Sequence, residues 1–139
     1  MNILVVEDNE PEHLILKEAF KEAEVTHEMY MVKDGIEALD FLRGAGDFSN
    51  APKPDLILLD LNMPRKNGLE VLADIKDNSK WAHIPVLVFS NSEFSGDICR
   101  CYNLGANAYL SKPVDFQGFV DLARIIDQFW FKLVRYCTH

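Results

Sequence analysis

Residues 56–68 read LILLDLNMPRKNG, and this stretch decides the fold. Four consecutive aliphatic residues are typical of a strand that is buried on both faces, as in a parallel sheet covered by helices. The run ends on Asp60, and a proline and a glycine follow within the next eight residues, which indicates a turn. Because an apolar run has no structural need to end on a charge, Asp60 is a candidate functional residue.

Short apolar runs alternate with longer amphipathic segments on both sides of this stretch. We expect strands at 2–6, 28–32, 55–59, 84–89 and 106–110, and helices at about 10–23, 35–42, 68–77, 95–104 and 115–136. Asn9 with Glu12, and Asp34 with Glu37, have the spacing of capping boxes. Residues 44–54 (GAGDFSNAPKP) are typical of a surface loop. The alternation predicts a single doubly wound α/β domain over residues 1–139, with helices on both faces of a parallel sheet.

The composition excludes some classes of function. The chain has 139 residues, of which 48% are hydrophobic and 26% charged, and this composition is typical of a folded domain. Its net charge of −8 argues against sequence-independent binding of nucleic acid and is compatible with a divalent cation or a basic partner. The apolar run at 3–6 is too short for a signal peptide or a membrane span. Cys99, Cys101 and Cys137 form no Cys-x-x-Cys pair, so we expect a reducing cytoplasm.

Polar side chains follow four of the expected strands. Glu7 and Asp8 follow the first strand, Asp60 the third, Ser90 the fourth, and Lys112 the fifth. Ligands of such folds bind outside the carboxyl ends of the parallel strands, where these side chains should converge. Polar residues are common at strand ends, but carboxylates, a hydroxyl and an amine have complementary roles. The sequence therefore predicts a pocket at this edge of the sheet.

The chemistry of this pocket points to phosphoryl acceptance. Three neighbouring carboxylates repel one another by on the order of a few kcal/mol per pair at an effective dielectric constant of about 20. A hard divalent ion such as Mg²⁺ relieves this repulsion, because it prefers oxygen ligands. Asp60 is then ionised and can attack phosphorus. Lys112 can neutralise charge on the transferring group, and Ser90 can donate a hydrogen bond to it.

Four segments together resemble the receiver domain of two-component response regulators, the CheY-like group: VVEDN at 5–9, LLDLNMPRKNG at 58–68, VFSNS at 88–92 and ANAYLSKP at 106–113. The resemblance implies a flavodoxin-like sheet of order 2-1-3-4-5. It implies that Glu7 and Asp8 hold Mg²⁺ or Mn²⁺ together with Asp60 and the main-chain carbonyl of Asn62. It further implies that Asp60 receives the phosphoryl group from a histidine kinase, so that the chain is a phosphorylated signalling protein that assists its own phosphorylation and dephosphorylation.

The same resemblance assigns further roles. Ser90 would be the switch hydroxyl, Tyr109 the switch aromatic, and the Lys112–Pro113 bond would be cis. Asn91 departs from the family pattern, since a small residue usually follows the switch hydroxyl. The tail IIDQFWFKLVRY at 125–136 is similar to that of stand-alone regulators that work with phytochrome-type photoreceptor kinases.

The last helix suggests how a signal leaves the domain. Members of one stripe have helical spacing and can face the sheet: Phe119, Val120, Ala123, Ile126, Trp130 and Leu133. Phe129, Phe131, Val134 and Tyr136 fall outside that stripe. Together with Trp130 they are interface candidates for a homodimer or a kinase-docking face formed by the last two helices and the last strand. Alternatively, the aromatic side chains fold over the domain's own loops.

Two other functions are compatible with the fold. A phosphohydrolase with an aspartyl-phosphate intermediate carries a second aspartate two positions after the nucleophile, where this chain has Asn62, which cannot transfer the proton. A pseudo-receiver would be a binding module that never takes phosphate, although all the required groups are present. We therefore expect a signalling protein rather than an enzyme.

Overall fold

A five-stranded parallel sheet forms the centre of the molecule. The computed structural model describes residues 1–63, 65–92 and 94–136 and gives the strand order β2-β1-β3-β4-β5. The strands are β1 (Asn2–Val6), β2 (Glu28–Val32), β3 (Leu56–Leu59), β4 (Val86–Ser90) and β5 (Ala108–Ser111). The predicted architecture and strand order are confirmed. All strands run the same way, so their carboxyl ends lie along one edge of the sheet.

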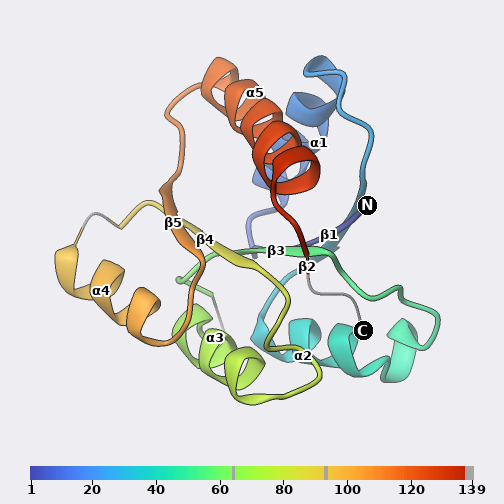
Figure 1. Cartoon of the computed structure of the whole chain (residues 1–139), viewed down its shortest axis with the longest axis vertical. Coiled ribbons are helices and arrows are strands. Elements are labelled where there is room, and N and C mark those ends of the chain that lie inside the picture. Colours follow the sequence, from blue (N-terminus) through green and yellow to red (C-terminus); the bar gives the residue numbers. More distant parts are fainter. Residues whose placement is uncertain (64, 93, 137–139) are drawn as a thin grey trace.

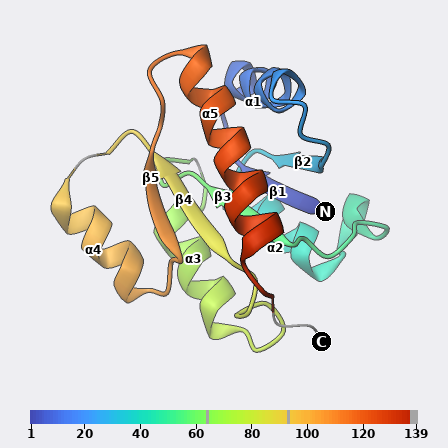
Figure 2. The ribbon, with the colours of Figure 1, turned by 45° about the horizontal axis from the view of Figure 1, so that its top comes forward.

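Helices cover both faces of the sheet (Figures 1 and 2). Helices α1 (Glu10–Glu22) and α5 (Phe116–Ile125) pack side by side on one face, while α2 (Gly35–Arg43), α3 (Gly68–Asp77) and α4 (Ser95–Asn103) cover the other. Successive side chains of a strand point to opposite faces. Accordingly, Ile3 and Val5 join the apolar cluster under α1 and α5, whereas Leu4 and Val6 join the cluster under α2 and α3.

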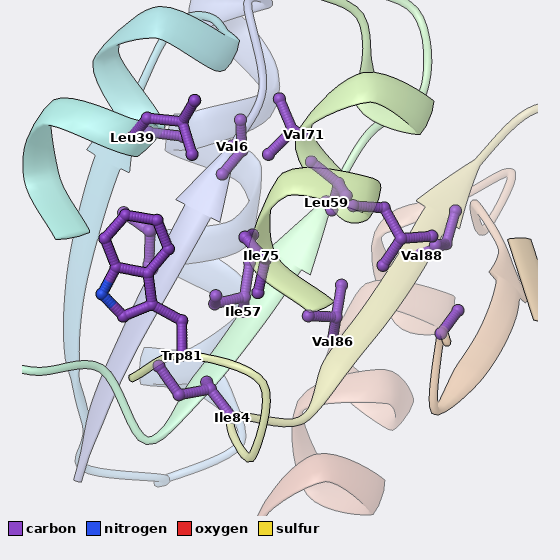
Figure 3. Close-up of a cluster of buried hydrophobic side chains, with 14 of the residues drawn as sticks. Val6, Leu39, Ile57, Leu59, Val71, Ile75, Trp81, Ile84, Val86 and Val88 are labelled. Carbon is purple, nitrogen blue, oxygen red and sulfur yellow. The ribbon is translucent and has the colours of Figure 1, made fainter. Parts of the chain in front are cut away.

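Figure 3 shows the cluster between the sheet and α2–α3. Leu59 and Val88 project from neighbouring strands toward Val71 and Ile75 of α3, and all four side chains are fully buried. Burial of an aliphatic side chain contributes about 1.5–3 kcal/mol. Such packing on both faces holds the central strands rigidly and therefore fixes the positions of the residues that follow them.

Side-chain caps begin the helices next to the site. Asn9 accepts a hydrogen bond from the Glu12 N–H at 3.1 Å, and Asp34 accepts one from the Glu37 N–H at 2.9 Å. The predicted cap positions are therefore correct. Neither glutamate returns a hydrogen bond to its cap: the Glu12 carboxylate accepts one from Lys112, and the Glu37 carboxylate one from the Lys33 N–H.

The C-terminal helix differs from the continuous helix predicted over 115–136. Helix α5 ends at Ile125, a π-helical segment occupies Ile126–Leu133, and Val134–Tyr136 are not helical. Within the segment, Asp127 accepts a hydrogen bond from the His27 ring at 2.9 Å, and the Phe131 ring lies 4.4 Å from that ring. These contacts with the segment before β2 hold the wider turns in place.

Among the residues with a described position, no helix is long and apolar enough to cross a membrane. Cys99 is exposed and Cys101 is buried on α4, both as free thiols. Cys137 lies outside the described residues.

Candidate functional site at the strand ends

Three carboxylates converge where β1 and β3 end. One oxygen each from Glu7, Asp8 and Asp60 lies within 4.8 Å of the others. Their backbones are held by the sheet, because the Asp60 N–H donates to the Val6 carbonyl at 3.0 Å and the Glu7 N–H donates to the Val32 carbonyl at 3.0 Å. The structure therefore brings together the three acids that the sequence placed at strand ends.

Lys112 reaches this cluster from the end of β5. Its Nζ lies 2.8 Å from Glu7, 2.9 Å from Glu12 and 3.7 Å from Asp60, and its side chain is only 7% exposed. Burial alone would lower the pKa of Lys112, but hydrogen bonds to Glu7 and Glu12 and the charge of Asp60 outweigh it and raise the pKa. Lys112 therefore remains a cation inside the site.

The acids still outnumber this one cation. Burial raises the pKa of Glu7 to about 7, despite the hydrogen bond from Lys112. Burial likewise raises the pKa of Asp60, although Lys112 and the backbone N–H groups of Asn62 and Leu61 act in the opposite direction. A site short of positive charge stabilises its carboxylates poorly, so burial favours the protonated form of both acids.

This donor set fits a divalent cation. Hard ions such as Mg²⁺ and Mn²⁺ bind carboxylate oxygens, and the two extra positive charges compensate the deficit at Glu7 and Asp60. Asp8 is exposed, so the cluster is open to solvent on its side. Asn62 lies two residues beyond Asp60; the ligand role of its main-chain carbonyl stays a prediction.

The two expected switch residues meet at one loop. Ser90 is fully buried at the end of β4, and its Oγ accepts a hydrogen bond from the Ser92 N–H at 3.2 Å. The Tyr109 hydroxyl donates to the carbonyl of the same Ser92 at 2.6 Å. The Lys112 N–H donates to the Ser90 carbonyl at 3.0 Å, which links this loop to the residues after β5.

The Lys112–Pro113 bond corrects one expectation. None of the peptide bonds within the described ranges is cis, and this bond is among them, so the cis geometry implied by the family resemblance is wrong here. Trans is the preferred form of an X-Pro bond, by about 0.5–1 kcal/mol. The Lys112 side chain reaches its carboxylate partners in the trans form.

Sequence reasoning missed the contribution of Glu12. Its position three residues after Asn9 indicated only a helix cap, yet its carboxylate is largely buried against Lys112. A sequence signal for this role is that Glu12 lies about one helical turn beyond Glu7 and Asp8, in the first turn of the helix that follows them.

Gly68 is required because α3 begins against the backbone of the site. A Cβ at this position would meet the Asp60 carbonyl oxygen and would lie 2.6 Å from the Leu61 Cα. The Gly68 N–H donates to the Leu61 carbonyl at 2.9 Å. The glycine therefore closes the loop that carries Asn62.

Comparison with known proteins identifies the family. The response regulator receiver domain family matches residues 3–124. The chain therefore belongs to the receiver domains of response regulators.

Several relatives are similar over nearly the whole chain. The response regulator Rcp1 of Synechocystis sp. is 39% identical over 132 residues, which cover 95% of this chain and 90% of Rcp1. The crystal structure of the phosphorylated cyanobacterial phytochrome response regulator RcpA superposes with a TM-score of 0.91 at 39% identity, covering 99% of this chain and 98% of that chain. The Mn²⁺-bound form of Rcp1 superposes with a TM-score of 0.88 at 37% identity, covering 99% of both chains.

Proposed function

We propose that this receiver accepts a phosphoryl group on Asp60 from a histidine kinase, in a reaction that depends on Mg²⁺. The observation that carries the proposal is the arrangement around Asp60: Glu7 and Asp8 lie beside it, and the Lys112 ammonium is 3.7 Å away. The Asp60 side chain is 7% exposed, whereas the neighbouring Asp8 is exposed to solvent.

The chain's own groups have distinct tasks in this transfer. An oxygen of Asp60 forms a bond to phosphorus while the bond from phosphorus to the donor breaks, and the leaving group keeps that electron pair. Lys112 neutralises charge on the transferred oxygens, and the Ser90 hydroxyl donates a hydrogen bond to one of them. A divalent ion held by Glu7, Asp8 and Asp60 would supply the remaining positive charge.

The donor is proposed to be a phytochrome-type photoreceptor kinase. RcpA is described as a cyanobacterial phytochrome response regulator, and it covers this chain almost completely. Similarity at this level supports the same kind of partner for this receiver. Acceptance of phosphate from such a kinase, but not from unrelated histidine kinases, would support the proposal.

Output is proposed to occur through protein contact, with homodimerisation as the simplest form. Along the C-terminal helix, Ile125, Phe129 and Leu133 are 59%, 49% and 71% exposed, at a spacing of four residues. Of the interface candidates predicted from the sequence, this exposed stripe contains only Phe129. Trp130 and Phe131 instead pack against the core under α1 and α5, and Val134 and Tyr136 are half-buried. Light scattering of the Leu133→Glu variant, before and after phosphorylation, tests the contact.

The central test is intact-protein mass spectrometry after incubation with acetyl phosphate, with and without Mg²⁺. We expect the wild type to gain one phosphoryl mass only with Mg²⁺, the Asp60→Asn variant to gain none, and the exposed control Asp47→Asn to behave as wild type. A phosphoryl adduct on the Asp60→Asn variant would disprove the assignment. Turnover of a small phosphomonoester would favour the phosphohydrolase. Absence of an adduct under every condition would favour the pseudo-receiver.

A further inference from the structure

Glu12 is a fourth carboxylate at the site, and it stands apart from the other three. It is not a member of the cluster formed by Glu7, Asp8 and Asp60, yet it lies 2.9 Å from the Lys112 ammonium. The cluster members follow strands, whereas Glu12 lies in the first turn of α1. The only site group that Glu12 contacts within hydrogen-bonding distance in the described structure is Lys112.

The position of Glu12 is fixed. Its N–H donates to both the side chain and the carbonyl of Asn9, each at 3.1 Å, so the capping interaction sets its backbone. Its side chain is 12% exposed, and that of Lys112 is 7% exposed. A charge-assisted hydrogen bond between two largely buried and well-positioned groups is among the stronger polar contacts in proteins.

We propose that Glu12 is a positioning residue that holds the Lys112 ammonium toward α1 and thereby weakens the site's hold on a phosphoryl group. This inference rests on the proposed function of Asp60 as phosphoryl acceptor. Lys112 is 0.8 Å farther from Asp60, at 3.7 Å, than from Glu12, at 2.9 Å. A phosphoryl group on Asp60 would therefore compete with Glu12 for the Lys112 ammonium.

A second effect acts in the same direction. A phosphoryl group brings negative charge next to Asp60, and the Glu12 carboxylate repels it through a largely buried, low-dielectric environment. A divalent ion compensates the charge of Glu7 and Asp60, the two other partners of Lys112, but Glu12 is outside that cluster. Competition for Lys112 and direct repulsion therefore both lower the affinity for phosphoryl.

The test uses fluoroberyllate, a phosphoryl mimic, titrated into the full chain at saturating Mg²⁺ and followed by fluorine NMR. We expect Glu12→Gln to lower the half-saturating concentration by about tenfold, because the substitution removes a hydrogen bond between charged groups. Glu12→Ala should shift it in the same direction. The matched control is Glu10→Gln, in the same helical turn, where an exposed acid pairs with Lys33 on the surface; it should stay within about twofold of wild type.

Mn²⁺ affinity, measured by electron paramagnetic resonance, separates positioning from a structural role. If Glu12 merely supports the fold, its loss weakens both metal binding and fluoroberyllate uptake. We expect fluoroberyllate uptake to strengthen while Mn²⁺ affinity does not increase. If the wild type binds fluoroberyllate and the Glu12→Gln variant binds it equally well or more weakly, this inference is overturned and the proposed function is not. A wild type that takes up none overturns the proposed function together with it.

Discussion

Arg65 donates from Nε to one carboxylate oxygen of Asp34 at 2.7 Å, and its Nη2 lies 2.6 Å from the same oxygen. Asp34 is buried at the start of α2, and its other oxygen caps that helix. Arg65 has φ +62°, a left-handed conformation that is unfavourable for residues other than glycine. The ion pair therefore holds the β3–α3 loop, which carries Asn62, in a conformation the backbone does not favour.

Loss of this ion pair should destabilise the fold measurably. We expect Arg65→Gln to lower the free energy of unfolding by about 1–2 kcal/mol, since Asp34 is left buried without its cation. The control is Lys66→Gln, next in sequence. Its partner Asp74, at 2.8 Å, is 45% exposed against 8% for Asp34, so this ion pair should contribute less than about 0.5 kcal/mol. Urea denaturation measures both. Equal losses in the two variants would contradict the role given to Arg65.

Gly68→Ala should be costly, because the new Cβ would meet backbone atoms of Asp60 and Leu61 that cannot move independently of the sheet. We expect a loss of about 2–4 kcal/mol in the free energy of unfolding. Gly96→Ala is the matched control. There the Cβ would meet the ring of Phe94, which is 69% exposed and free to turn, so the change should be neutral or slightly stabilising.

Lys112→Ala leaves three largely buried carboxylates without their cation. Without Mg²⁺, we expect the variant to lose about 3–5 kcal/mol in the free energy of unfolding, the usual cost of breaking a buried ion pair. Saturating Mg²⁺ should reduce the loss, because the ion would compensate these carboxylates in place of the ammonium and would therefore stabilise the variant more than the wild type. Urea titrations in chelator and in Mg²⁺ give both values. Identical losses under the two conditions would argue against a divalent ion at Glu7, Asp8 and Asp60.

Glu7 should give the metal-free protein a defined pH dependence. Burial raises its pKa from an ordinary 4.5 to about 7, so the folded state binds this proton more tightly than the unfolded state. The contribution of this proton to the stability of the folded state is complete below pH 4.5 and is lost as the pH rises through 7. Relative to Glu7→Gln, the wild type should lose on the order of 2 kcal/mol between pH 5 and 8. A difference in the free energy of unfolding between wild type and Glu7→Gln, measured in chelator, that stays constant from pH 5 to 8 would refute this prediction.

The C-terminal segment makes opposite predictions for two neighbouring apolar residues. Phe131 packs against the core and the His27 ring, so Phe131→Ala should cost about 2 kcal/mol. Leu133 is 71% exposed, so Leu133→Ala should cost less than about 0.5 kcal/mol in dilute protein. Thermal unfolding distinguishes the two. A larger loss at Leu133 than at Phe131 would contradict this assignment of exposed and buried side chains.

Much of the fold was predictable because its signals are local. Strands buried on both faces need near-continuous apolar runs, and a run such as 56–59 has few other uses. The convergence of Glu7, Asp60 and Lys112 followed from the same reasoning, since parallel strands place their ends at one edge of the sheet. The phosphoryl role itself came from the resemblance to receiver domains.

The features that escaped prediction depend on contacts between distant segments. Spacing showed that Glu12 could cap a helix. Its carboxylate instead accepts a hydrogen bond from Lys112, and this contact depends on where β5 ends. The ion pair of Arg65 with Asp34 joins two loops that are far apart in sequence. The exposure of Leu133 and burial of Phe131 depend on a change of helix type that apolar periodicity does not reveal.

The π-helical segment Ile126–Leu133 has a consequence for sequence change in this lineage. A helix of this kind differs from an α-helix by about one additional residue in a turn. Deletion of a single residue there would restore α-helical winding and change which side chains of the segment face solvent. One small genetic event could therefore exchange the side chains offered to a partner while leaving the phosphoryl site untouched, which gives related regulators a short route to new association preferences.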